Sequence, residues 1–144
     1  MKLADLLLEM PPEVVEDIEQ EFKRKFLKLG IMLNFTKHFT NRISDTTDDA
    51  EGHSRDEISE EELRDLFNRV ERKHGELFKL AKEFDDELKR GEFEGVIRQE
   101  LKNINVPFAL AFKKNLGRFV LTCKTILKKK AAFVNRDTDH VIEV

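Results

Sequence analysis

The sequence predicts an α+β fold, in which N-terminal helices pack on a small antiparallel β-sheet. Three observations lead to this prediction. Apolar residues recur at helical spacing between residues 12 and 88, and they alternate with polar or small residues from residue 93 onward. A chain of 144 residues with a 40% apolar share is long enough to bury one core. We expect a single domain, 1–144, with helices over 1–33, a middle part over 34–90 and the sheet over 91–144.

The N-terminal part contains two predicted helices. Residues 3–9 form a short helix that ends before Pro11 and Pro12. A second helix begins at these prolines, because proline is tolerated in a first helical turn. Its apolar side chains follow three- and four-residue steps: Val15, Ile18, Phe22, Phe26 and Leu29. Gly30 is the expected C-terminal stop.

The middle part carries the residues on which the functional interpretation depends. His38 and Arg42 are four positions apart, so they share one face if residues 34–43 are helical. An adjoining face is apolar and could bury the segment: Phe35, Phe39 and Ile43. An imidazole and a guanidinium beside an apolar anchor can hold a phosphate and move a proton.

An acidic, turn-rich loop over residues 45–57 follows. Ser59 and Glu62 then have the spacing of a capping box, which indicates the start of a further helix. The apolar stripe of that helix resumes beyond Gly75, so the sequence allows one kinked helix or two.

The C-terminal part reads as a meander of strands. Residues 106–112 alternate as on a half-buried strand, residues 115–117 form a hairpin turn, and residues 118–126 are the return strand. Residues 93–99 give a third strand, and the tail 141–144 is a possible fourth.

Composition excludes several classes of protein. Cys123 is the single cysteine, so no disulfide framework is possible and a reducing cytosol is expected. No apolar run approaches the roughly 20 residues of a membrane helix, and the N-terminus lacks the basic segment of a secretory signal. We therefore expect a cytoplasmic protein with no membrane partner.

No metal or cofactor is expected either. The four histidines are dispersed, with no cysteine pair and no H-E-x-x-H spacing: His38, His53, His74 and His140. The acidic loop lacks the alternation of an EF-hand, and there is no phosphate-binding glycine loop and no G-x-S-x-G motif. Cys123, inside a predicted strand, is expected to be a small buried hydrophobe.

Charge is divided unevenly along a chain whose net charge is −3. Residues 45–62 carry nine acidic groups against Arg55 alone, whereas residues 113–136 carry no acidic group. The basic residues of that second segment are Lys113, Lys114, Arg118, Lys124, Lys128, Lys129, Lys130 and Arg136. Such a hairpin can bind a polyanion, although both patches can equally be solvated surface.

RNA cleavage is the chemistry that these residue types allow without a metal. The 2′-hydroxyl of the substrate attacks the phosphorus, and the protein supplies a base, an acid and cations. His38 suits either proton-transfer role, and Arg42, Arg55, Lys124 and the Lys128–Lys130 run could supply the cations. The alternative for His38 is a surface histidine packed on Phe35 or Phe39.

Two short motifs carry a family resemblance. His-Phe-x-x-Arg from His38, and Arg-x-x-Ile-x-x-x-x-Leu-x-x-Leu-Phe from Arg55, resemble the N-terminal signature of the RegB-like endoribonucleases. These form a phage-associated branch of the barnase/EndoU/colicin/RelE-like RNases. The resemblance covers roughly residues 34–135 and implies a RelE-like fold of N-terminal helices on an antiparallel sheet. It assigns catalytic positions to His38, Arg42 and Arg55.

One position departs from the family pattern. The second histidine of these enzymes falls on Asn68, and His74 lies six residues further along. Lys124, His53 or His74 could take its place, the domain could bind RNA without cutting it, or the resemblance could be one of fold alone. A separate hypothesis is a non-enzymatic phage accessory protein that binds a host protein through its acidic loop.

Overall fold

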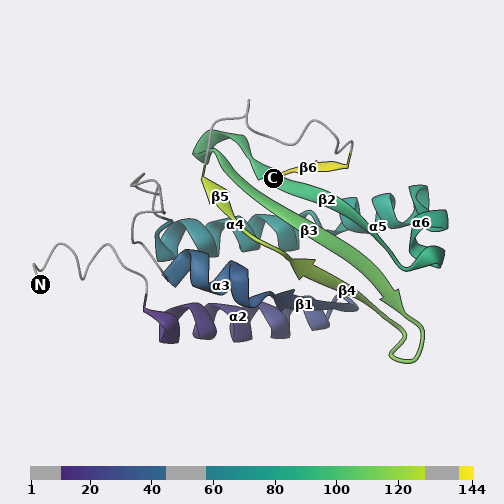
Figure 1. Ribbon diagram of the computed structural model, residues 1–144, viewed down its shortest axis with the longest axis horizontal. Helices are drawn as coiled ribbons and strands as arrows, with labels where there is room; N and C mark the ends of the chain where they lie inside the picture. Colours follow the sequence, from purple (N-terminus) through teal and green to yellow (C-terminus); the bar gives the residue numbers. More distant parts are fainter. Residues whose placement is uncertain (1–10, 45–57, 129–139) are drawn as a thin grey trace, which may run out of the picture.

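Helices cover one face of a twisted sheet in the computed structural model (Figure 1), which describes residues 11–44, 58–128 and 140–144. The predicted α+β class is confirmed. The helices are α2 (Pro12–Leu27), α3 (Lys37–Ser44), α4 (Glu60–Arg72), α5 (His74–Glu83) and α6 (Asp85–Arg90), with a 3₁₀ turn at Glu100–Lys102. The strands are β1 (Ile31–Phe35), β2 (Glu92–Gln99), β3 (Ile104–Lys113), β4 (Arg118–Cys123), β5 (Leu127–Lys128) and β6 (Val141–Glu143).

The sheet is mixed, whereas the sequence predicted an antiparallel one. Its strand order is β1-β4-β3-β2-β6, with β5 paired to β3. The β2–β3 and β3–β4 pairs are antiparallel, but β1 runs parallel to β4 and β6 runs parallel to β2. The β1 strand comes from the helical half of the chain. Its parallel neighbour β4 follows only after helices α3 to α6 and strands β2 and β3, which provide the long connection that parallel strands need.

Local signals located most elements correctly. The second predicted helix begins at the prolines as α2, and the break near Gly75 separates two helices, α4 and α5. The hairpin turn is confirmed between β3 and β4, where Gly117 has a φ of +63°. The helix expected over residues 3–9 lies outside the described residues.

The β1 strand was not predicted. Residues 34–43 were expected to form one helix, but Phe35 ends β1 and α3 begins at Lys37. Burial in β1 alternates, with Ile31, Leu33 and Phe35 buried. A short apolar run of this length does not distinguish a strand from a helix by period alone.

One core lies between the helices and the sheet. Alternate side chains of β3 and β4 belong to it: Ile104, Val106, Phe108, Leu110, Leu121 and Cys123. The return strand ends at Cys123 instead of residue 126, since Ile126 is also buried and breaks the alternation. Lys124 therefore stands directly after the end of β4.

The start of α4 has the predicted capping box. Ser59 Oγ accepts from the Glu62 N–H at 3.1 Å, and the Glu62 carboxylate accepts from the Ser59 N–H at 3.1 Å. Lys128 of β5 adds an ion pair to the same carboxylate at 3.0 Å. Glu62 thus joins the first turn of α4 to the sheet.

We expect Glu62→Gln to destabilise the protein by about 1 kcal/mol near neutral pH. Burial works to raise the pKa of Glu62, but hydrogen bonds from the Ser59 N–H and from Lys128 outweigh it and hold the pKa below its ordinary value of 4.5. A carboxyl with a lowered folded pKa stabilises the fold above its unfolded pKa, and this contribution is lost as the pH falls through the folded value.

Urea unfolding at a series of pH values measures this difference. The wild type and Glu62→Gln should converge as the pH falls below the lowered pKa of Glu62 in the folded protein, because the protonated acid resembles the amide. The exposed Glu61 in the same turn supplies the control, Glu61→Gln. An equal loss in both variants at every pH would contradict the assignment.

Candidate functional site

Helix α3 is fixed against the end of β4 by Thr36. The Thr36 hydroxyl accepts from the Phe39 N–H at 3.1 Å and donates to the Lys124 carbonyl at 2.7 Å. The Thr36 N–H also donates to the Cys123 carbonyl at 3.2 Å. One threonine therefore caps the helix and attaches it to the residue that carries a predicted cation.

Arg42 makes the second attachment. Its Nε donates to the Ile126 carbonyl at 2.8 Å, while Phe39 and Ile43 bury the other side of the helix. His38 lies between Thr36 and Arg42 in the chain, and its side chain is exposed. An exposed side chain fits both the proton-transfer role and the alternative of a surface histidine.

The first turn of α3 contains no acidic residue and carries Lys37 and His38. A helix N-terminus has partial positive charge and N–H groups without helical partners, so it favours anions. The Lys37 ammonium adds its positive charge to that of the helix end. This end of α3 suits a phosphate better than a cation.

Lys124 reaches across the sheet to β2. Its Nζ lies 2.5 Å from a carboxylate oxygen of Glu94, and the two side chains are 39% and 66% exposed. An ion pair this exposed is typically worth less than about 1 kcal/mol, so a phosphate can compete for the lysine. Sequence analysis did not predict a role for Glu94. Its position between Phe93 and Gly95 on β2 could have assigned it to the face of the sheet opposite the helices.

The basic hairpin is divided in space. Lys113, Lys114 and Arg118 lie at or beside the β3–β4 turn, and α3 lies at the other end of the molecule (Figure 1). Six residues of strand separate Arg118 from Lys124, which corresponds to roughly 20 Å. Lys128 in turn is paired with Glu62. Of the predicted cations, α3 is brought to the segment that carries Lys124 and not to the hairpin turn.

Asn68, which stands where the RegB-like pattern has its second histidine, contacts helix α2. Asn68 of α4 accepts from Lys25 of α2 at 3.5 Å. His74 begins α5, where its Nδ1 lies 2.8 Å from the Glu71 carbonyl and its ring lies against Phe78. Neither is joined to α3 by a hydrogen bond. The remaining predicted site residues lie outside the described residues: Arg55, His53, Lys129 and Lys130.

Cys123 is buried, and burial raises the pKa of its thiol far above the usual range. The thiolate nucleophile is therefore not formed near neutral pH. Within residues 11–44, 58–128 and 140–144, no three histidine, cysteine or carboxylate side chains gather as metal ligands. In the same ranges, no helix is both long and apolar enough to cross a membrane.

Comparisons of the chain with family models, with curated proteins and with solved structures give no significant match. The resemblance to RegB-like endoribonucleases therefore remains a prediction from the two sequence motifs.

Proposed function

We propose that the protein binds RNA at the surface formed by α3 and the segment after β4, and that His38 makes it a metal-independent endoribonuclease. The observation that carries the proposal is the pair of hydrogen bonds from Thr36 and Arg42 to the carbonyls of Lys124 and Ile126. These bonds hold the helix that exposes His38 against the backbone that follows β4, whereas the Lys124 side chain extends over the opposite face of the sheet to Glu94.

The chemistry uses groups of this chain and the substrate. The 2′-oxygen forms a bond to phosphorus as the bond from phosphorus to the 5′-oxygen breaks, leaving a 2′,3′-cyclic phosphate and a 5′-hydroxyl. His38 takes the proton of the 2′-hydroxyl or delivers a proton to the leaving oxygen. The N–H groups at the α3 N-terminus and the exposed Lys37 beside them stabilise the charge on the phosphate oxygens.

We expect His38→Ala to lower the cleavage rate by about 10²- to 10⁴-fold, the usual contribution of one proton-transfer group. The assay follows labelled single-stranded RNA in the presence of EDTA, and a cyclic phosphate end identifies the mechanism. Because the side chain is exposed, the variant should unfold at the same urea concentration as the wild type.

Asn41→Ala is the matched control, since Asn41 is exposed on the same helix. Its cleavage rate should equal that of the wild type. Equal rates for His38→Ala and wild type, or cleavage abolished by EDTA, would contradict the mechanism. RNA that is bound but not cut would remove the catalytic half of the proposal and leave the binding half.

A further inference from the structure

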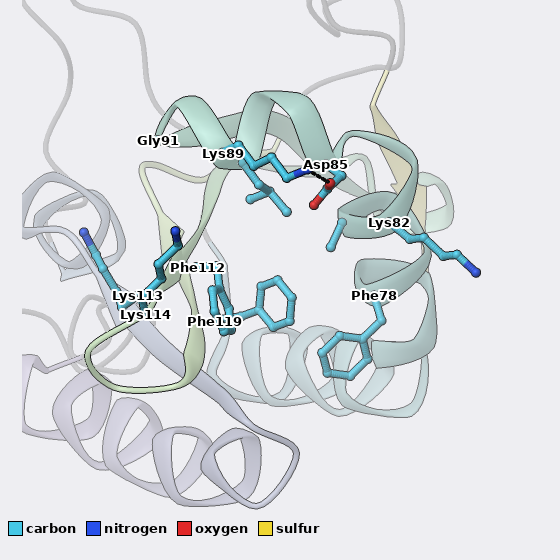
Figure 2. Close-up of a pocket in the computed structure, with 11 residues that line it drawn as sticks. Phe78, Lys82, Asp85, Lys89, Gly91, Phe112, Lys113, Lys114 and Phe119 are labelled. Atoms are coloured by element: carbon cyan, nitrogen blue, oxygen red, sulfur yellow. Dashed lines mark ion pairs between the residues drawn. The ribbon is translucent and has the colours of Figure 1, made fainter.

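A pocket of about 870 Å³ opens between the β3–β4 hairpin and helices α5 and α6, away from α3 (Figure 2). Its apolar lining includes three phenylalanine rings: Phe78, Phe112 and Phe119. Its charged lining consists of four lysines and one aspartate: Lys82, Lys89, Lys113, Lys114 and Asp85. The volume falls in the range that proteins use for small molecules.

The three rings form an aromatic cluster in which neighbouring rings meet edge to face. The centroids of Phe112 and Phe119, which are cross-strand partners, lie 5.0 Å apart with the ring planes at 62°, and those of Phe78 and Phe119 lie 5.4 Å apart at 61°. Phe112 remains 40% exposed. Folding therefore leaves an aromatic surface in the pocket that a flat ring can cover.

The pocket is basic in a protein that is acidic overall. Lys89 pairs with Asp85 at 3.0 Å. Within the described part of the chain, no carboxylate pairs with Lys82, Lys113 or Lys114. The hairpin therefore carries two lysines without a carboxylate partner at the edge of the pocket, while the Lys82 side chain points away from the rings (Figure 2).

The aromatic rings and the lysines together indicate which kind of molecule fits the pocket. A second copy of the chain would bring the same lysines into contact with themselves. A folded protein partner would bury about 800 Å² on each side, over a surface much broader than a pocket. An unpaired nucleotide has both a flat ring and a negative charge, and single-strand-binding proteins combine basic grooves with aromatic stacking surfaces.

We propose that this pocket binds an unpaired nucleotide of single-stranded RNA, with the base stacked on the exposed Phe112 ring and the phosphates on Lys113 and Lys114. The inference rests on the proposed function, for which it names a strand-binding site separate from His38.

Fluorescence anisotropy with labelled single-stranded oligouridine tests the pocket directly, with a self-complementary RNA duplex as a second probe. We expect the single strand to bind more tightly than the duplex, in which the bases are already stacked. Phe112→Ala should weaken single-strand binding by about 5- to 100-fold, the usual effect of one lost stacking ring. The double variant Lys113→Gln/Lys114→Gln should make the slope of log affinity against log salt shallower by about 0.7 for each lost phosphate contact.

Two controls match these variants. Leu116→Ala removes an exposed apolar side chain from the same hairpin, and Lys79→Gln removes an exposed charge from α5, both outside the pocket lining. Both should bind like the wild type. Two results would contradict nucleotide binding in the pocket. One is equal affinity of Phe112→Ala and Leu116→Ala for the oligouridine, and the other is displacement of the oligouridine by polyglutamate as readily as by unlabelled RNA.

The two proposals fail in distinguishable ways. If cleavage depends on His38 but not on Phe112, and Phe112→Ala binds RNA with unchanged affinity, the proposed nucleotide pocket is wrong and the proposed ribonuclease activity stands. Binding that depends on Phe112 without any cleavage supports the pocket and removes the catalytic role of His38. Failure of the wild type to bind either probe overturns both.

Discussion

Replacing Phe67 by alanine is expected to lower the free energy of unfolding by about 3–5 kcal/mol, a large part of the stability of an ordinary domain. Phe67 of α4 is fully buried and contacts rings from three other elements. Its centroid lies 5.7 Å from Phe22 of α2, 5.1 Å from Phe35 of β1 and 6.2 Å from Phe39 of α3. The cavity left by alanine would loosen all four elements at once.

Urea unfolding followed by far-ultraviolet circular dichroism measures this loss, and Phe112→Ala is the control for the same truncation at a partly exposed site. Phe112→Ala should lower the free energy of unfolding by less than about 1 kcal/mol. The same measurement shows whether this variant is folded in the binding assay. The proposed ribonuclease activity of Phe67→Ala should fall in proportion to the fraction of the protein that is unfolded, because Phe39 anchors the helix that carries His38. Equal stability losses in the two variants would contradict the central position of Phe67.

The helices were predictable because their signals are local. The prolines before α2 and the Ser59–Glu62 box each determine a helix start within a few residues. The β1 strand was not predictable in this way, because five apolar or polar residues between two helices carry no decisive period. Its pairing with β4 joins segments almost ninety residues apart in the chain, Ile31 with Phe119.

The candidate site was predictable only in part, for a related reason. The spacing of His38 and Arg42 is local, and the structure puts them on one short helix. The partners of the cations are distant in sequence, since Lys124 pairs with Glu94 and Lys128 pairs with Glu62. A count of basic residues therefore overstated the charge available beside His38.

The pocket at the hairpin turn was missed because its rings come from two separate parts of the chain, α5 and the β3–β4 hairpin. One signal was present in the sequence: twelve phenylalanines with no tryptophan or tyrosine. Most of these rings enter the core, and Phe112 does not. The sequence had indicated a polyanion-binding hairpin at Lys113 and Lys114, but that prediction did not include the aromatic residue beside them.

Gly95→Ala is the second substitution for which a large loss is expected, although it adds a single methyl group. A Cβ at Gly95 would lie 2.6 Å from the His140 carbonyl oxygen and 2.7 Å from the Phe108 ring. The same carbonyl accepts the Val96 N–H at 2.9 Å, and Phe108 is fully buried. The methyl group must therefore displace either the chain leading into β6 or a core ring, at a cost of about 2–4 kcal/mol.

Gly75→Ala separates this clash from the general effect of removing a glycine. A Cβ at Gly75, inside α5, meets nothing within 4 Å, so that variant should be equal to the wild type or more stable by up to about 1 kcal/mol. Amide hydrogen exchange locates the damage in Gly95→Ala, because faster exchange at Val96 reports the loss of its bond to His140. Unchanged protection at Val96 together with an unchanged unfolding midpoint would mean that β6 is not held on β2 by this contact. Since β6 is only three residues long, its attachment to the sheet would then depend on Ile142 in the core.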